Sequence, residues 1–288
     1  MQPNFFIVGA PKSATTNMSY YLMQHPKVFM PEYLEPYYFA RLDVPENYQR
    51  KIVSDKKEYL NLFRKATNYK AVGESSPIYL YCPHSASDIK DHFPDSKIII
   101  SLRNPIEIAQ SQYFSLQFMR YDTRSFGKIL DSNEEQIARG EFHIDNLLVA
   151  GFYSKHIKRF QQVFSADRIK IAIFEEYIKN TVPTINSILS FLGIDDTVDF
   201  VEPPKGAYRT PKNSIAKILL ESSTFRKTAQ RIIPTVTRQR LGDRFFAKET
   251  KKPPIPQEER ERLKRIYEKD VKDLEVLLGR KFPWDDFG

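Results

Sequence analysis

FFIVGAPKSATT, residues 5–16, decides the fold class of this chain. Its first four residues form a short continuous apolar run, which is typical of a strand buried on both faces. Gly9 ends the run, a loop of small residues follows, and the spacing of apolar residues becomes helical from Thr15. A strand, a small-residue loop and a helix in this order predict an α/β unit built on a parallel sheet.

The loop after this strand carries groups that suit an anion. A helix N-terminus presents unpaired N–H groups and partial positive charge, and small residues let the backbone close around a ligand. Lys12 adds a full positive charge, and Ser13, Thr15 and Thr16 add hydroxyl donors. The loop is not a Walker A motif, because Lys12 lies only three residues after Gly9 and follows a proline. We therefore predict a phosphate or sulfate site here, the alternative being a small-residue turn with an exposed lysine.

A second set of anion-binding groups follows the clearest apolar run of the chain, residues 97–102. Arg103 stands at the carboxyl end of this predicted strand, where open α/β sheets bind their ligands. Ser111 follows about two helical turns later. A guanidinium and a hydroxyl together suit a phosphate. Taken with the first loop, they predict one ligand that carries two separated anionic groups.

Strands and helices alternate through most of the sequence. We predict an α/β fold with a P-loop-like parallel sheet, helices on both faces and a C-terminal helical extension. The 288 residues are assigned to one domain, with a core of about residues 1–200 and a covering loop and helical extension over about 201–288. Further strands are predicted over residues 28–30, 70–74 and 169–174. Helices are predicted over residues 15–24, 47–65, 85–92, 106–119, 133–138, 146–163, 181–192, 215–231 and 257–278. Residues 248–256 are assigned to a basic, proline-rich linker.

Composition narrows the class of protein. The net charge is +8, with the excess rising over residues 205–265, which indicates a basic surface or an anionic ligand. Cys82 is the single cysteine, so no intrachain disulfide forms and a reducing, cytoplasmic setting is expected. No apolar stretch has the length of a membrane span. The basic third lacks interleaved aromatics, so no nucleic-acid partner is predicted. The oligomeric state stays open.

Glu74 is the candidate for acid–base chemistry. It ends the predicted strand 70–74, where its carboxylate can face the same crevice as Lys12 and accept a proton from an alcohol. The alternative is a glutamate that caps the following turn. The histidines lie at spacings that suggest no metal cluster, so no metal is predicted.

Two segments carry a resemblance to a known family. Residues 6–16 resemble the 5′-phosphosulfate loop of sulfotransferases that use PAPS (3′-phosphoadenosine 5′-phosphosulfate), and residues 100–111 resemble their 3′-phosphate motif. Within that family the chain looks closest to the bacterial and heparan-sulfate-type branch, whose base-bearing segment is similar to residues 74–79. The resemblance implies transfer of a sulfuryl group from PAPS to a hydroxyl or amine of an acceptor, without a metal, and release of PAP (3′-phosphoadenosine 5′-phosphate).

The resemblance also implies roles for single residues. Lys12 would contact the 5′-phosphate and the bridging oxygen, and Glu74 would be the general base. The phosphosulfate would be held by Ser13, Ala14, Thr15 and Thr16. The 3′-phosphate would be held by Arg103 and Ser111. A loop that contains Lys205, Gly206 and Arg209, or Lys212, would cover the nucleotide.

Two positions depart from the family pattern. Ala14 stands where the loop usually has glycine, and alanine resists positive φ. Leu34 stands where a lysine often precedes the glutamate of a segment that here contains Glu35 and Pro36. The second departure implies a different acceptor or another cation in place of the lysine.

Two other functions remain open from the sequence. One is a P-loop kinase that uses ATP, which the broken Walker motif and the lack of a clear Mg²⁺-binding aspartate disfavour. The other is a non-catalytic protein whose basic C-terminal third docks a polyanion. The acceptor of a sulfotransferase also stays open among a glycan, a lipid, a carrier-bound chain and a small molecule.

Overall fold

The computed structural model describes residues 1–32, 34–44, 52–119, 122–203, 209–211, 247–249 and 252–288, with the backbone alone for 118–119, 209–211 and 247–249. Lys205, Gly206, Lys212 and the predicted helix 215–231 therefore lie outside the described residues.

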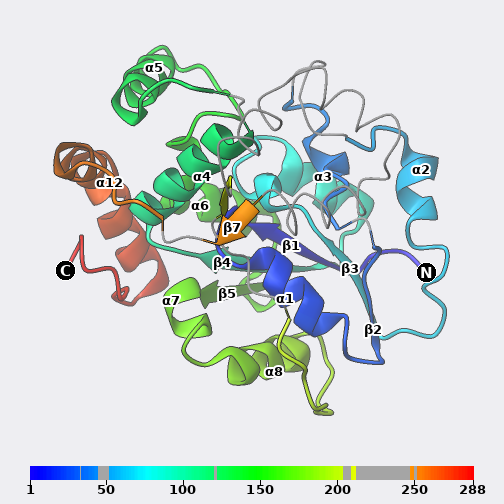
Figure 1. Cartoon of the computed structure of the whole chain (residues 1–288). Helices are drawn as coiled ribbons and strands as arrows, with labels where there is room; N and C mark the ends of the chain where they lie inside the picture. Colours follow the sequence, from blue (N-terminus) through cyan, green and yellow to red (C-terminus); the bar gives the residue numbers. More distant parts are fainter. Residues whose placement is uncertain (33, 45–51, 120–121, 204–208, 212–246, 250–251) are drawn as a thin grey trace.

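A parallel five-stranded sheet forms the centre of the molecule (Figure 1), in the order β2-β3-β1-β4-β5. The chain leaves β1 toward one edge of the sheet and β4 toward the other. The carboxyl ends of these two neighbours therefore border the crevice at which such sheets bind ligands. The strands are β1 (Phe5–Gly9), β2 (Val28–Phe29), β3 (Ala71–Ser75), β4 (Lys97–Leu102) and β5 (Ile169–Ile173).

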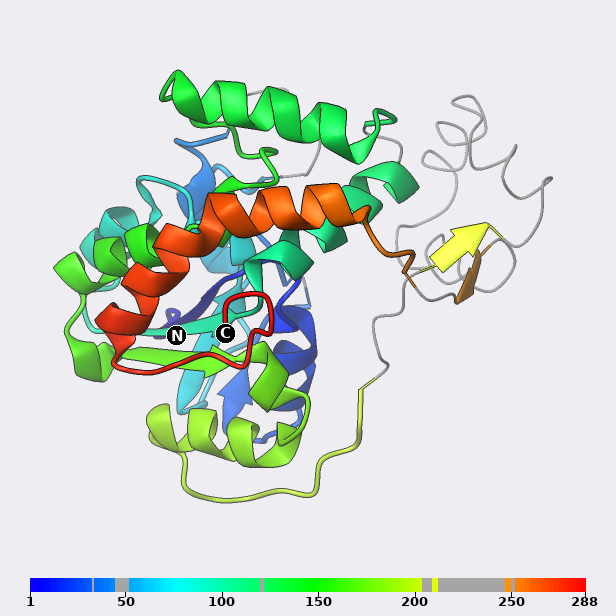
Figure 2. The same ribbon diagram turned by 90° about the vertical axis from the view of Figure 1, so that its left-hand side faces the viewer.

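Helices cover both faces of the sheet, as the sequence predicts. Alternate side chains of β1 point to opposite faces, with Phe5 and Ile7 in one apolar cluster and Phe6 and Val8 in the other. The first cluster includes α1 and α8, and the second includes α3, α4, α6 and α12 (Figures 1 and 2). The helices are α1 (Thr15–Leu22), α2 (Lys56–Asn61), α3 (Ser85–His92), α4 (Pro105–Met119), α5 (Phe126–Ala138), α6 (Tyr153–Val163), α7 (Phe174–Tyr177), α8 (Thr181–Phe191) and α12 (Gln257–Leu278).

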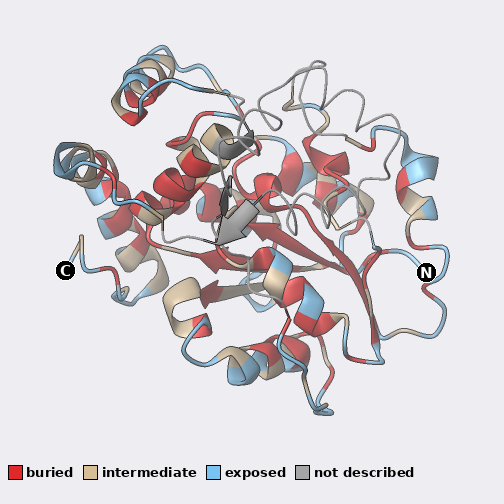
Figure 3. Cartoon of the chain, viewed as in Figure 1, coloured by how far each residue is buried: buried red, intermediate tan, exposed pale blue. Residues whose placement is uncertain are grey.

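Short elements complete the described chain. Figure 3 shows that β1, β3 and nearly all of β4 are buried, which explains the apolar runs of β1 and β4. Among the described helices, none combines the length and apolar character that a membrane crossing requires. The 3₁₀ turns are η1 (Tyr38–Ala40), η2 (Pro77–Leu80), η3 (Val149–Gly151) and η4 (Ala166–Arg168), and β6 (Arg209–Pro211) pairs antiparallel with β7 (Ala247–Glu249).

Three predicted helices have different bounds. The helix predicted over 47–65 is limited in the described residues to α2, because the Asp55 side chain accepts a hydrogen bond from the Glu58 N–H at 2.8 Å and caps the helix there. The helix predicted over 133–138 begins earlier, at Phe126. The one predicted over 146–163 is divided into η3 and α6, because Phe152 leaves the helical conformation.

The C-terminal helix ends as predicted, at Gly279 with φ of 63°. The segment after it returns alongside β5, which Figure 2 shows in red. The Trp284 indole N–H donates to the Glu175 carboxylate at 3.0 Å, just beyond the end of β5. The C-terminal segment is thereby fixed near the carboxyl ends of the strands.

Candidate active site

The two predicted anion-binding motifs meet at the carboxyl ends of β1 and β4. The Arg103 guanidinium donates through Nη1 to the carbonyl oxygen of Lys12 at 3.0 Å. The Ser101 hydroxyl donates to the Ser13 carbonyl, and the Ala10 N–H donates to the Ser101 carbonyl, both at 2.7 Å. Segments that are far apart in the sequence therefore form one site.

The backbone of the first loop turns sharply. Lys12 and Ala14 have φ of 64° and 63°, in the left-handed region. Gly9 lies so close to η2 that a Cβ there would stand 2.5 Å from the Leu80 Cβ and 2.8 Å from the Pro77 carbonyl oxygen. These constraints bring the chain back over the sheet, so that α1 begins at the mouth of the crevice.

Ala14 should be a point of backbone strain, as its departure from the family pattern suggests. It caps α1 in the left-handed conformation, where glycine is favoured both by φ and by the N-cap position. We expect Ala14→Gly to raise the free energy of unfolding by about 0.5–1 kcal/mol, measured by urea denaturation. Ala138→Gly, in the last turn of α5, is the control; it should give no stabilisation. A lower free energy of unfolding for Ala14→Gly would contradict the strain.

Two buried polar atoms in the crevice have no hydrogen-bond partner among the described residues. They are the Ser13 hydroxyl oxygen and Arg103 Nε. A buried donor without a partner costs free energy, and functional sites keep such groups for a ligand. Of the other predicted hydroxyls, Thr15 is buried beside Ser13, whereas Thr16 is exposed. Ser13 and Arg103 are thus suited to the oxygens of an anionic ligand.

Arg103 is held in place through both its side chain and its backbone. Its guanidinium carbon lies 4.4 Å from the centroid of the Phe174 ring, and the Tyr153 hydroxyl donates to its carbonyl oxygen at 2.7 Å. The Asn104 side chain caps α4 by accepting from the Ile106 N–H at 3.0 Å. The side chain of Arg103 is 16% exposed, so it is largely fixed before any ligand binds.

The structure adds Lys252 to this site, a residue that the sequence analysis assigned to a linker. Its ammonium donates to the Ser111 hydroxyl at 2.9 Å. Burial lowers the pKa of Lys252, and the charge of Arg103 lowers it further, while Glu107 opposes the shift. Two cations and a hydroxyl gathered in a partly buried place suit an anion. The signal in the sequence was a lysine directly before Pro253-Pro254, inside the basic segment.

The predicted covering loop is described only at Arg209. The backbone of Arg209 pairs with Glu249 in the β6–β7 ladder, three residues before Lys252. The covering loop and the segment that carries Lys252 are therefore joined through this ladder.

Glu74 is not exposed to the crevice. Its side chain is completely buried and accepts hydrogen bonds from the Ser76 hydroxyl at 2.7 Å, the Tyr79 hydroxyl at 2.8 Å and the Tyr59 hydroxyl at 3.4 Å. Burial raises the pKa of Glu74 to about 8, although these three hydrogen bonds oppose the shift; the charge of Glu35 adds to it. Glu74 pairs in register with Phe6 of the neighbouring strand β1.

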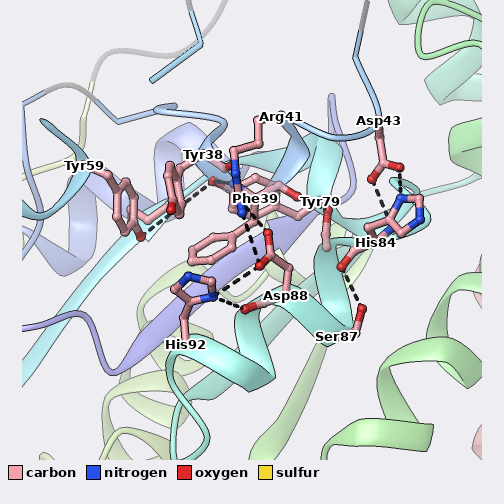
Figure 4. A network of polar contacts seen from close by, with 12 residues as sticks. Tyr38, Phe39, Arg41, Asp43, Tyr59, Tyr79, His84, Ser87, Asp88 and His92 are labelled. Carbon is pink, nitrogen blue, oxygen red and sulfur yellow. Dashed lines mark hydrogen bonds and ion pairs between the residues drawn. The ribbon is translucent and has the colours of Figure 1, made fainter. Parts of the chain in front are cut away.

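Aromatic side chains lie next to Glu74, and Figure 4 shows two of its hydrogen-bond donors, Tyr59 and Tyr79. The Tyr38 and Tyr59 rings are stacked with centroids 4.5 Å apart, and the Arg41 guanidinium lies 4.3 Å from the centroid of the Tyr38 ring. Arg41 in turn donates to the Asp88 carboxylate at 2.6 Å. These aromatic side chains are fixed by this ion pair, so Glu74 stays separated from solvent.

Glu35 is a second carboxylate near the site. It is half-buried, and the Tyr37 hydroxyl donates to it. The neighbouring Leu34 packs its partly buried side chain against the apolar cluster around β1 and α1, which fits an apolar residue at this position. Among the described residues, no group of three or more His, Cys, Asp or Glu could hold a metal ion.

Comparison with known proteins decides the family. A family model described as "Sulfotransferase family" matches residues 3–198. The chain belongs to the sulfotransferase family. The fold agrees: the crystal structure of a sulfotransferase from Alicyclobacillus acidocaldarius superposes with a TM-score of 0.73 and 28% sequence identity, covering 98% of each chain.

Curated relatives share part of their length with this sulfotransferase. Membrane-associated sulfotransferase kil1 of Dictyostelium discoideum is 27% identical over 161 residues, which are 56% of this chain and 32% of kil1. Human bifunctional heparan sulfate N-deacetylase/N-sulfotransferase 2 is 26% identical over 214 residues, with 69% of this chain and 23% of that protein covered. The chain thus spans a third or less of these relatives. Membership in the family favours sulfuryl transfer over the kinase hypothesis.

Proposed function

We propose that this sulfotransferase moves a sulfuryl group from PAPS to a hydroxyl or amine of an acceptor, and that the acceptor is a glycan, as the names of several relatives suggest. The observation that carries the proposal is the contact between Arg103 and the Lys12 carbonyl, because it joins the two anion-binding motifs in one crevice. PAPS carries anionic groups at both the 5′ and the 3′ positions, which matches two such motifs.

The residues present fit both ends of the nucleotide. The N-terminus of α1 with Lys12, Ser13, Ala14, Thr15 and Thr16 would hold the phosphosulfate, and the unpartnered Ser13 hydroxyl supports this end. Arg103, Ser111 and Lys252 would hold the 3′-phosphate, which the unpartnered Arg103 Nε supports. Lys205, Gly206 and Arg209 remain the proposed covering loop.

The proposed chemistry is an in-line displacement. The acceptor oxygen or nitrogen forms a bond to sulfur while the bond from sulfur to the bridging oxygen of the 5′-phosphate breaks, and PAP leaves. The acceptor proton passes to a glutamate carboxylate. Lys12 offsets the negative charge that grows on the leaving phosphate, so catalysis rests on positioning and charge stabilisation, with no metal in the scheme.

Two carboxylates, Glu74 and Glu35, are candidates for the general base. Glu74 is the residue that the sequence predicts, but its enclosure opposes direct contact with an acceptor; Glu35 is partly accessible. We expect a loss of about a hundredfold in single-turnover transfer for the glutamine variant that removes the base. Loss in Glu74→Gln with retention in Glu35→Gln supports Glu74, and the reverse assigns the base to Glu35. Retention in both variants would contradict a glutamate base.

The raised pKa of Glu74 predicts a pH-dependent stability. The pKa of Glu74 in the folded state, about 8, lies above the ordinary glutamate pKa of about 4.5, so the folded state favours the protonated carboxyl. This contribution is complete below about pH 4.5 and is lost as the pH rises through about 8. Wild type should therefore lose more thermal stability than Glu74→Gln between pH 6 and pH 9, measured by the melting temperature. Parallel losses in the two proteins would show that Glu74 does not bind a proton on folding.

Two measurements test the proposed function. PAP should raise the melting temperature of the full chain more than ATP does at equal concentration, and the opposite order would favour the kinase hypothesis. Isotopically labelled PAPS with a panel of glycans and small acceptors should then give a labelled product. Salt-sensitive binding to heparin without any transfer would instead support the non-catalytic polyanion-binding hypothesis.

A further inference from the structure

A carboxylate stands inside the group of cations around Arg103. Glu107 lies in the first turn of α4, with Oε2 3.6 Å from Arg103 Nη2, and its charge also acts on Lys252. A phosphate at this place must share both cations with Glu107. The affinity of the site for an anion therefore depends on how strongly the Glu107 carboxylate attracts Arg103 and Lys252.

A third cation holds the other side of Glu107. Arg260, near the start of α12, reaches Glu107 Oε1 with Nη1 at 3.2 Å. Its Nε and Nη2 donate to the two oxygens of Asp286, each at 2.8 Å, in a bidentate pair. Asp286 is fixed in turn by the Asn104 side-chain amide, which donates to it at 2.7 Å.

The charges thus alternate along a line from the C-terminal segment to the nucleotide site: Asp286, Arg260, Glu107, Arg103. Asp286 orients the Arg260 fork, and the remaining guanidinium nitrogen donates to Glu107 Oε1, whereas Arg103 lies nearest to Oε2. Hydrogen bonds to Asp286 and Glu107 raise the pKa of Arg260 in spite of its burial, in keeping with two close carboxylates.

We propose that Arg260 is a positioning residue for the nucleotide: it pairs with Glu107 and so leaves Arg103 and Lys252 available to the 3′-phosphate. This inference rests on the proposed function. Without Arg260, the Glu107 carboxylate keeps its contact with Arg103, and its charge still acts on Lys252, so a phosphate must compete with that carboxylate for both cations. A residue far along the sequence, on α12, would in this way set nucleotide affinity without touching the nucleotide.

A double-mutant cycle on the full chain tests the proposal, with the dissociation constant for PAP measured by calorimetry. Arg260→Gln should weaken PAP binding by about three- to tenfold, since it releases Glu107 onto the phosphate-binding cations. Glu107→Gln should bind PAP at least as tightly as wild type. The double variant should bind like Glu107→Gln, because no carboxylate remains for Arg260 to hold.

The same helix offers a matched control. Arg262 is paired with Glu134 at 2.6 Å and with Asp131 at 2.8 Å, both on α5 and not at the nucleotide site. Arg262→Gln removes the same charge from α12, so it should leave the PAP affinity within about twofold of wild type. A loss equal to that of Arg260→Gln would show a general charge effect and overturn the proposal.

The remaining outcomes separate this inference from the proposed function. If wild type binds no PAP, the proposed function fails and the inference with it. If wild type binds PAP and Arg260→Gln weakens binding without rescue by Glu107→Gln, Arg260 acts by holding the C-terminal segment, and the inference alone is overturned.

Discussion

Arg103→Met should weaken the binding of PAP by about a hundredfold or more. The guanidinium carries the fork that suits a phosphate, and a charge-assisted pair lost from a largely buried site costs about 2–5 kcal/mol. The Arg103 side chain is 16% exposed, so it counts as largely buried. Because 5′-AMP lacks the 3′-phosphate, its affinity should change much less. Calorimetry with PAP and 5′-AMP on the full chain measures the difference.

Arg168→Met is the control for this experiment. Arg168 lies directly before β5, at the opposite end of the sheet, where it donates to the Asp95 carbonyl at 2.6 Å. Its replacement removes the same charge but should not change the affinity for PAP. Equal losses for PAP and 5′-AMP in Arg103→Met would contradict phosphate binding, since they would mean that Arg103 serves only to hold the loop through the Lys12 carbonyl.

Lys12→Ala should lower single-turnover sulfuryl transfer by about a hundredfold. An ammonium placed at the leaving phosphate offsets charge that develops in the transition state, and removing one such group costs about 10²–10³ in rate. PAP affinity should fall less than the rate does, because the α1 N-terminus and the hydroxyls remain. Rapid-quench transfer from labelled PAPS to an acceptor found in the panel measures the rate.

Lys27→Ala serves as the matched lysine variant. Lys27 is exposed and pairs with Asp196, outside the crevice, so its replacement should leave transfer unchanged. Unchanged transfer in Lys12→Ala as well would remove Lys12 from the chemistry. A fall in rate that is fully explained by weaker PAPS binding would limit Lys12 to a binding role.

The meeting of the two anion motifs was predictable from the sequence for a physical reason. Buried parallel strands read as short apolar runs, and the carboxyl ends of neighbouring parallel strands share one edge of the sheet. The polar residues that follow two such runs, at 12 and 103, therefore meet when the two strands are neighbours, as β1 and β4 are. Register or loop detail is not needed for that inference.

The surroundings of Glu74 were not predictable in the same way. Every residue of β3 is buried, so alternation along the strand does not indicate which face Glu74 occupies. Its enclosure depends on Tyr59 from α2 and on Tyr79 from η2, two contacts between separate elements. The sequence therefore could not predict that the Glu74 carboxyl is fully buried, and its role as the base stays a prediction.

The sequence did not predict Lys252 and Arg260 as residues of the site, for a related reason. Both belong to the C-terminal part of the chain, and their partners Ser111 and Glu107 lie on α4, so only tertiary packing relates them. A basic, proline-rich segment followed by a charged helix is usually a solvated surface. Nothing in the local pattern distinguishes the two residues that face the site from the many that do not.

Calorimetry with three nucleotides tests the central claim most directly, namely that Lys12 and Arg103 bind opposite ends of one adenosine nucleotide. Wild type should bind one PAP per chain. Arg103→Met should lose most affinity for PAP and 3′-AMP but little for 5′-AMP, and Lys12→Ala should show its larger loss with PAP and 5′-AMP. No heat with PAP, or the same pattern of losses in both variants, would contradict the claim.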